Sequence, residues 1–385
     1  MTLKPSRRSG VDPFLAMDVL AAANRLKSAG HPVISMAVGQ PSEPAPLAVR
    51  EAAKTALDAG DIGYTDALGR AELRRAIARH YGERHNIDVD PARVAVTTGS
   101  SAGFNLAFLA LFNPGDRVAI ARPGYPAYRA VMALLGIEVV EIPVGAIGTL
   151  DAAHVAAAHR VKKLDGVLTA NPANPTGAGL GRDAFAELVR YCRDNAIALI
   201  SDEIYHGLTY GGGETSALDI DDGATIINSF SKYCCMTGWR IGWMVLPEAL
   251  VRPVERIQQS LFISAPDISQ RAAVEAFGAR DELEAVKRRY AANRALLAEA
   301  LPAAGLPLAA PMDGAFYAWC DISKYSSDSM AFSRRMLEEI HVAATPGVDF
   351  DPVDGRHTMR FSYAGSTADM VEAARRIGVW LERGG

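Results

Sequence analysis

The feature that most constrains the fold is an alternation of strand-like and helical segments that runs from Pro46 to Leu246. Short apolar runs are separated by longer segments with the helical hydrophobic period. Because parallel strands need long crossover connections, usually helices, this alternation predicts a mostly parallel sheet with helices on both faces. The expected strands are 93–97, 117–121, 138–142, 166–170, 197–201, 225–228 and 243–246, and the expected helices are 47–59, 71–85, 101–112, 125–135, 152–159 and 182–195.

The two ends of the chain differ from this central region. An extended arm, an alanine-rich helix at 14–29 and a short strand broken at Gly39 come first. Helices near 249–260, 267–279, 282–300, 329–340 and 367–382, with apolar segments at 315–320 and 359–363, come last. We expect both ends to form a smaller α+β domain. The expected boundaries are 1–45 for the arm and first helix, 46–282 for a large domain and 283–385 for the C-terminal part of the small domain.

Charge and cysteine usage narrow the class of protein. The 385 residues carry a formal charge of −4, which gives no case for a nucleic-acid or membrane-surface partner. The basic start lacks a signal-peptide core and no apolar run is long enough to span a bilayer, so we expect a cytoplasmic protein. The four cysteines form no CxxC pair, and none lies at metal-ligand spacing from a histidine. Neither a disulfide framework nor a metal site is therefore expected.

Ligands of such sheets bind beyond the carboxyl ends of the strands, so the residues after each strand are the candidates for a site. The segment Thr98-Gly99-Ser100-Ser101-Ala102 follows the first strand and enters a helix. Its backbone N–H groups, hydroxyls and helix dipole suit a phosphate, although serines that only cap a helix give the same pattern. No Walker A loop and no GxGxxG motif occurs in the chain.

Three further strand ends carry polar or aromatic residues. Tyr125 either stacks on a planar ligand or closes the core. Asn174 lies in a turn of prolines and glycine, where it is turn punctuation or an amide donor to a ligand. Asp202, followed by Tyr205, ends an apolar strand; a carboxylate there is costly unless it meets a cation such as a protonated pyridine nitrogen.

The segment after strand 225–228 contains Lys232 and Arg240 without a carboxylate nearby in sequence. Burial and a neighbouring cation lower the pKa of a lysine, which it needs to form a Schiff base with a carbonyl. Arg240, Ser229 and Ser231 suit a phosphate. A solvated loop lysine explains this stretch alone equally well. The placement of all these groups on one sheet edge is what favours a functional site.

Two residues outside the alternating region are candidates for a substrate site. Arg360 lies in the middle of a short apolar strand, where it is either paired with the frame or binds a substrate carboxylate. Gly39 is either a plain turn residue or a position where the backbone approaches a ligand closely.

Together these segments resemble the class I/II aminotransferases, pyridoxal-phosphate enzymes of fold type I that include aspartate aminotransferase. The resemblance covers nearly the whole chain. It implies a mostly parallel seven-stranded sheet between helices, a smaller α+β domain, pyridoxal 5′-phosphate as the cofactor, and a homodimer with shared active sites. The motifs that carry it are Gly63-Tyr64-Thr65-Asp66, Thr98-Gly99-Ser100-Ser101-Ala102, Pro123-Gly124-Tyr125-Pro126, Asn174-Pro175-Thr176-Gly177, Asp202-Glu203-Ile204-Tyr205, Ser229-Phe230-Ser231-Lys232, Arg240-Ile241-Gly242 and Arg360-Phe361-Ser362.

The resemblance also implies a role for each matching residue. Lys232 would form the Schiff base and shuttle the proton, and Asp202 would partner the pyridine nitrogen. Asn174 and Tyr205 would contact the phenolic oxygen of the cofactor, and Tyr125 would stack on its ring. The other implied cofactor contacts are Ser100, Ser101, Ala102, Ser229, Arg240 and, from the partner subunit, Tyr64; the implied substrate contacts are Gly39, Asn174 and Arg360.

The implied reaction is a ping-pong transfer of the amino group of an L-amino acid to a 2-oxo acid. Ser101 stands where some aspartate-using relatives have a lysine for the distal carboxylate, which makes aspartate a less expected substrate. Aromatic residues near the mouth of the site, namely Phe14, Tyr64, Phe316 and Tyr317, favour an apolar or aromatic amino acid.

Other functions of the same scaffold are the alternatives. A C–S lyase acting by β-elimination would keep every cofactor residue. A sensing domain fused to a DNA-binding module is a further alternative, for which the chain shows neither a winged helix nor a basic face.

Overall fold

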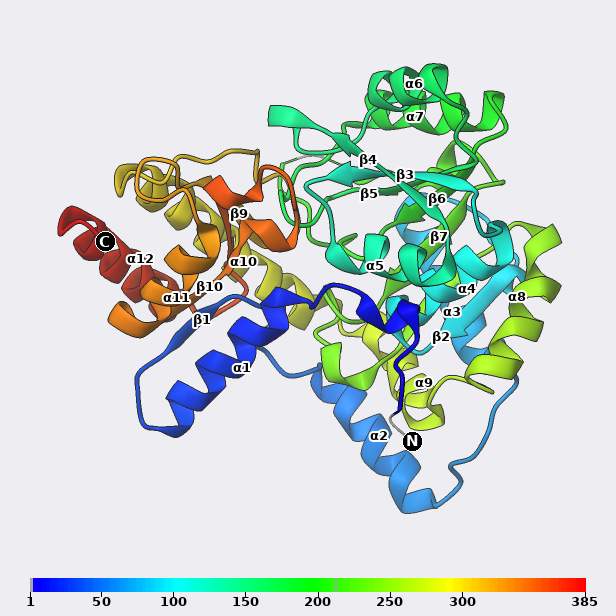
Figure 1. Ribbon diagram of the computed structural model, residues 1–385. Coiled ribbons are helices and arrows are strands. Elements are labelled where there is room, and N and C mark those ends of the chain that lie inside the picture. The colour runs from blue at the N-terminus through cyan, green and yellow to red at the C-terminus, as the bar shows by residue number, and fades with distance from the viewer. Residues whose placement is uncertain (1–2, 212) are drawn as a thin grey trace.

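The computed structural model describes residues 3–211 and 213–385 and contains a seven-stranded and a four-stranded sheet (Figure 1). The larger sheet has the strand order β2-β8-β7-β6-β5-β3-β4. Strand β8 is antiparallel to both of its neighbours, and the other pairs are parallel. The mostly parallel sheet expected from the sequence is therefore confirmed. Its strands are β2 (Val94–Thr97), β3 (Arg117–Arg122), β4 (Glu138–Pro143), β5 (Gly166–Ala170), β6 (Ala198–Asp202), β7 (Thr225–Ser229) and β8 (Gly242–Val245).

Helices cover both faces of this sheet. Within β3, Val118 and Ile120 enter one hydrophobic core and Ala119 enters the other, because successive side chains of a strand point to opposite faces. The first core includes side chains of α4 (Gly99–Leu111), α5 (Pro126–Leu135) and α8 (Glu248–Leu261). The second includes side chains of α2 (Leu47–Ala59), α3 (Ala71–His85), α6 (Ala152–Val161), α7 (Arg182–Asp194) and α9 (Asp267–Val274).

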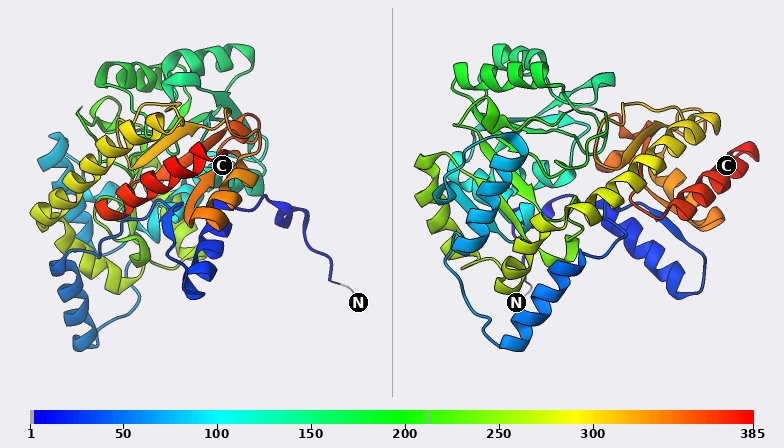
Figure 2. Two further views of the ribbon diagram at one scale, coloured as in Figure 1. Left: turned by 90° about the vertical axis from the view of Figure 1, so that its left-hand side faces the viewer. Right: turned by 180° about the vertical axis from the view of Figure 1, so that it is seen from behind.

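The smaller sheet joins the two ends of the chain in the order β1-β10-β11-β9. Its strands are β1 (Ile34–Met36), β9 (Tyr317–Asp321), β10 (Val342–Pro346) and β11 (Thr358–Ser362), and its helices are α1 (Leu15–Ser28), α10 (Arg280–Ala303), α11 (Ser329–Ile340) and α12 (Thr367–Glu382). Figure 2 shows α10, in yellow, running from one sheet region to the other. Its Leu283 packs in a core of the large sheet, and its Tyr290 and Leu297 pack in the core of the small one.

Two differences from the expected elements matter for the site. Helix α4 begins at Gly99, two residues before the expected start at 101, so Gly99 and Ser100 belong to its first turn. Strand β10 was not expected; it follows α11 after a single residue, His341, whose left-handed backbone ends the helix. It pairs with β1 and with β11, and thereby places Arg360 of β11 in the middle of the small sheet.

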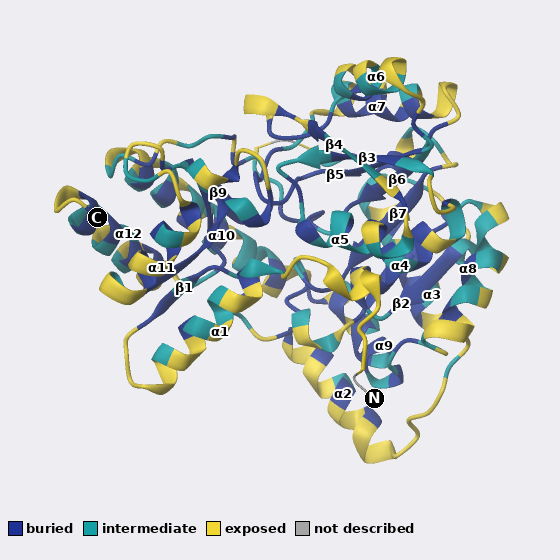
Figure 3. Ribbon diagram, in the orientation of Figure 1, coloured by how far each residue is buried: buried dark blue, intermediate teal, exposed yellow. Residues whose placement is uncertain are grey.

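Burial follows the layered arrangement (Figure 3). Every residue of β2 and β7 is buried, as expected for strands covered on both faces. Within the ranges that the structure describes, no helix is long and apolar enough to cross a membrane.

The first helix is held by a carboxylate from the other end of the chain. Phe14, the residue before α1, gives no side-chain cap, but both oxygens of Asp349 accept hydrogen bonds from the N–H groups of Leu15, at 2.9 Å, and Ala16, at 3.1 Å. A carboxylate at this position satisfies the free donors of the first turn and favours the helix dipole. Asp349 therefore fixes where the N-terminal segment enters the fold.

We predict that Asp349→Ala lowers the free energy of unfolding by about 1 kcal/mol, the usual effect of losing a helix cap. It should also speed protease cleavage near α1, which limited proteolysis measures. Asp328→Ala is the matched control, because Asp328 caps α11 through the Ala331 N–H at 3.0 Å. That variant should lose similar stability without faster cleavage near α1, and equal cleavage in both variants would contradict the anchoring role.

Candidate active site

A cavity of about 230 Å³ lies beyond the carboxyl ends of the large sheet, where the small sheet meets it. Asp202 from the end of β6, Lys232 from the segment after β7 and Arg360 from β11 all line it. The cavity therefore brings together residues that are far apart in the sequence. The sequence-predicted residues that line it are Gly39, Ser100, Ser101, Tyr125, Asn174, Asp202, Tyr205, Ser231, Lys232, Arg240 and Arg360.

Three predicted residues do not line this cavity. Ser229 is buried; its hydroxyl contacts the Ser231 hydroxyl at 2.7 Å, and Ser231 lines the cavity instead. Ala102 is buried in the first turn of α4. Tyr64 is 84% exposed and lines a separate surface depression.

The aromatic residues expected near the mouth fall into two groups. Phe14 and Tyr317 line the cavity, whereas Phe316 is fully buried and does not. Tyr317 contributes more than its sequence position suggested. The Tyr317 hydroxyl contacts the Tyr205 hydroxyl at 2.8 Å. A Cβ atom at Gly39 would lie 1.7 Å from the same Tyr317 hydroxyl. The tyrosine therefore occupies space that only a glycine at position 39 leaves free.

The first turn of α4 and Arg240 together present hydrogen-bond donors to the cavity. The N–H groups of residues 98–101 are the ones that a helix beginning at Gly99 leaves without a carbonyl partner, and Ser100 and Ser101 line the cavity. The Arg240 guanidinium packs so closely on Gly99 that a Cβ atom there would lie 2.5 Å from Nη2. Gly99 also has a φ of +72°, so both its conformation and its contact require glycine. This set of donors suits a phosphate group.

Lys232 is placed where its amine loses a proton readily. Its Nζ donates a hydrogen bond to the Gly39 carbonyl at 2.6 Å. Burial, followed by the positive charges of Arg360 and Arg240, lowers the pKa of Lys232 to about 8. No carboxylate within the described part of the chain forms an ion pair with it. A lysine in this state is a nucleophile toward a carbonyl carbon.

Asp202 is a buried carboxylate at the same edge. One of its oxygens accepts a hydrogen bond from the Tyr128 hydroxyl, and the other accepts from the Ile204 N–H at 3.1 Å. Burial raises the pKa of Asp202 to about 6, and these hydrogen bonds and the charge of Lys232 oppose that shift. Sequence analysis missed the contact of Tyr128 with Asp202, although Tyr128 lies only three residues after Tyr125, in the first turn of α5. A cationic ligand group beside Asp202 would keep the carboxylate ionised.

Arg360 presents a buried positive charge that no protein carboxylate neutralises among the described residues. Its Nη1 donates to Asn174 Oδ1 at 2.8 Å and its Nη2 donates to the Ala37 carbonyl at 2.6 Å. The guanidinium carbon lies 4.3 Å from the centre of the Tyr317 ring and 4.5 Å from that of Phe350. Since an unpaired buried charge is costly, this arrangement fits a site that receives a carboxylate from a ligand.

The fold and this cavity define an aminotransferase of the aspartate aminotransferase-like type. Residues 31–377 match the family "Aminotransferase class I and II", and the chain belongs to that family. It is 47% identical over 386 residues to the valine–pyruvate aminotransferase of Mycobacterium tuberculosis, covering 99% of each chain.

Solved structures agree with this assignment. An aminotransferase from M. tuberculosis superposes with a TM-score of 0.96 and 46% identity, covering 99% of this chain and 100% of that one. The aspartate aminotransferase of Thermus thermophilus superposes with a TM-score of 0.91 and 31% identity, covering 98% and 100%. The resemblance inferred from the sequence motifs is thereby confirmed, and so is the enzyme class.

Members of this family generally use pyridoxal phosphate and form dimers. The residues present fit that cofactor on the chain's own chemistry. The α4 amides and Arg240 suit its phosphate, the Lys232 amine suits its carbonyl, and buried Asp202 suits a protonated ring nitrogen.

We predict that Arg360→Gln raises the pKa of Lys232 above 8, because it removes the neighbouring charge that most disfavours the ammonium form. The measurement is the pH dependence of Lys232 acylation in the cofactor-free protein, followed by mass spectrometry. Arg360→Lys keeps a positive charge and should leave this pKa near 8. A pKa that is the same in the wild type and the Gln variant would show that Arg360 does not act on Lys232.

Proposed function

We propose that this protein is a pyridoxal-phosphate-dependent aminotransferase that moves the amino group of a small apolar L-amino acid, such as valine, to pyruvate. The observation that carries the proposal is a buried Arg360, which forms no ion pair with a described carboxylate, beside a lysine whose pKa is lowered to about 8, in a cavity that Phe14, Met17 and Val38 line in part. The M. tuberculosis relative at 47% identity is named a valine–pyruvate aminotransferase, which supports this choice of substrates.

We assign the cofactor contacts to residues of the cavity. Ser100, Ser101 and Arg240 hold the phosphate, with the N–H groups at the start of α4. Asp202 binds the ring nitrogen, and Lys232 binds the carbonyl carbon. The bound cofactor acts as an electron sink for the Cα of the substrate. Ser231 replaces Ser229 as the serine of this segment that lines the cavity.

The chain's own residues then perform three tasks. Arg360 and Asn174 orient the α-carboxylate of the substrate. Arg360 attracts it by charge. Asn174 contributes its side-chain amide, which is held in place because its oxygen accepts a hydrogen bond from Arg360. The Lys232 amine would take the proton from the substrate Cα, a role that its lowered pKa suits. Product release and entry of the second 2-oxo acid then complete a ping-pong cycle.

The choice of a small apolar substrate rests on the charges and shape of the cavity. Among the described residues, the cations that line it are Lys232, Arg240 and Arg360, and the proposal gives each of them to the cofactor or to the α-carboxylate. A distal carboxylate would therefore meet no further cation among these lining residues. The remaining walls near the entrance include Phe14, Met17 and Val38, which suit an aliphatic side chain, and Tyr317 limits its size.

We also propose a homodimer in which the partner completes the site. Tyr64 is 84% exposed in the single chain, and Ile62 and Ile263 beside this surface are exposed as well. Covering such a surface with a second copy would bury these apolar groups. Tyr64 would then contact the cofactor phosphate of the other subunit.

The proposal predicts that valine and other small apolar amino acids convert pyruvate to alanine, and that aspartate reacts at least about a hundredfold more slowly in kcat/KM because its distal carboxylate would be buried unpaired. A panel of amino acids with pyruvate measures this directly. Ser101→Lys should raise the relative rate with aspartate, since it adds the missing cation. Lys232→Ala is the inactive control.

Two results would overturn the proposal. Equal use of aspartate and valine by the unaltered enzyme would contradict the substrate class. Release of pyruvate from β-substituted amino acids without a 2-oxo acid acceptor, and no alanine formed from valine and pyruvate, would assign the chain to the C–S lyases instead.

A further inference from the structure

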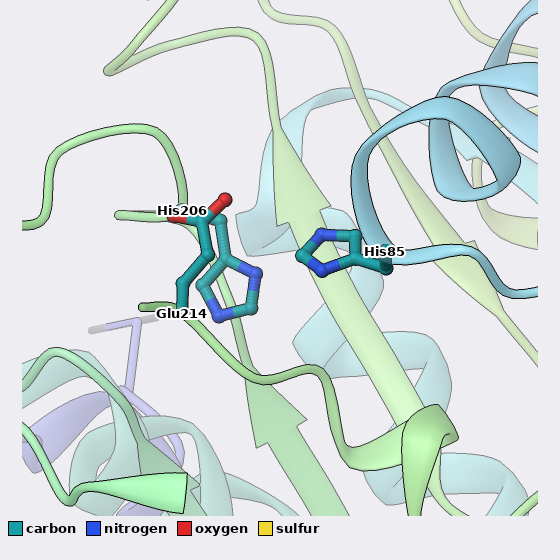
Figure 4. A group of neighbouring side chains, drawn as sticks. All are labelled: His85, His206 and Glu214. Atoms are coloured by element: carbon teal, nitrogen blue, oxygen red, sulfur yellow. The ribbon is translucent and has the colours of Figure 1, made fainter. Parts of the chain in front are cut away.

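A second cluster of polar side chains lies outside the cavity that contains Lys232. His85 is the last residue of α3, His206 follows β6, and Glu214 belongs to the loop after it. Figure 4 shows the three side chains gathered together, and one ligand atom of each lies within 4.8 Å of the others. None of the three lines the proposed cofactor cavity. The proposed catalytic reaction therefore gives them no role.

His206 is the least satisfied member of the cluster. It is 6% exposed, and neither ring nitrogen makes a hydrogen bond of good geometry with the described residues, although the Asn171 backbone lies beside the ring. The nearest carboxylate oxygen, of Glu203, lies 3.5 Å from Nδ1. Buried polar groups without partners are rare because each costs the free energy of its lost hydration. An imidazole in this state has lone-pair capacity available for a ligand.

Glu214 is held in place and ionised. Its Oε1 accepts a hydrogen bond from Arg84 and its Oε2 accepts from the Gly207 N–H at 2.6 Å. These two contacts fix both oxygens of the Glu214 carboxylate, and an ionised carboxylate and a neutral imidazole are the forms that bind metal ions.

We propose that His85, His206 and Glu214 form a binding site for a divalent transition-metal ion, best suited to Zn²⁺, with water as the fourth ligand. Two imidazole nitrogens and one carboxylate oxygen are a common ligand set for zinc. Tetrahedral ligands about 2.0–2.1 Å from zinc lie about 3.4 Å apart, so the side chains must draw together by roughly 1 Å. The Arg84 guanidinium opposes the ion, and its bond to Glu214 is the contact that must lengthen.

The site would connect three segments near the active site. His206 is adjacent to Tyr205 and four residues after Asp202, and the ion would tie this turn to the end of α3 and to the Glu214 loop. Because the unfolded chain does not hold the ligands together, binding stabilises the folded state. The sequence predicted no metal site, since these ligands are distant in the chain and form no spacing motif.

The experiment titrates the chelator-treated, tag-free holoenzyme with Zn²⁺ by calorimetry and with Co²⁺ by visible absorption. We expect one ion per chain and a Co²⁺ spectrum of tetrahedral type. His206→Asn and His85→Asn should each weaken metal binding by at least about a hundredfold. Loss of a residue that only hydrogen-bonds a metal ligand already weakens binding about 10- to 100-fold, and loss of the ligand itself should weaken it more. Glu214→Gln should also weaken binding, because it removes the anionic ligand.

A matched control uses the exposed His31, whose ring lies 4.7 Å from that of His341 and forms a rival surface pair. His31→Asn should leave the affinity unchanged. Retention of the visible cofactor band and of thermal stability without metal shows that each variant folds. If the His206 variant does not fold, the His85 variant carries the test, because His85 is half-buried at the end of a helix. Absence of stoichiometric binding, or loss of binding only in His31→Asn, would overturn the proposal.

Discussion

The site depends on one electrostatic condition, which is that the Lys232 amine is kept from being fully protonated. Burial and two neighbouring guanidinium groups produce this condition. The groups around the amine come from separate parts of the chain. Arg360 belongs to β11 of the small sheet, Arg240 lies before β8 of the large sheet, and the Gly39 carbonyl that accepts from Nζ follows β1. The lowered pKa of Lys232, which favours its proposed role as a nucleophile, therefore depends on the assembly of both sheets around it.

The parallel sheet supplies the frame for that condition. Its strands end at one edge, so short polar segments after β2, β3, β5, β6 and β7 converge without any one segment needing to be long. The small sheet adds Arg360, the proposed receptor of the substrate carboxylate, and Asp349 ties the N-terminal helix to the same region, where Phe14 and Met17 line the cavity. In the proposed function, the binding of the substrate carboxylate and of the cofactor phosphate is thus divided between the two sheets.

Much of this arrangement could be predicted from sequence, because the helix–strand period fixes the sheet and the sheet fixes which residues meet. What could not be predicted depends on contacts between segments. Strand β10 is short and is defined by its pairing with β1 and β11. Of the two serines that the sequence offered for a phosphate, Ser229 and Ser231, only Ser231 lines the cavity, and the Tyr128 contact with Asp202 depends on how α5 packs on the sheet. The His206 cluster is of the same kind, since its members meet only in the fold.

The most direct test of the account is to identify the lysine that binds the cofactor. The protein is loaded with pyridoxal phosphate, reduced with borohydride to make the bond to the amine permanent, digested, and mapped by mass spectrometry. The account predicts that the label lies on Lys232 at about one per chain, because Lys232 combines a lowered pKa with a place in the cavity. A label on another lysine, or one spread over the surface lysines, would contradict it.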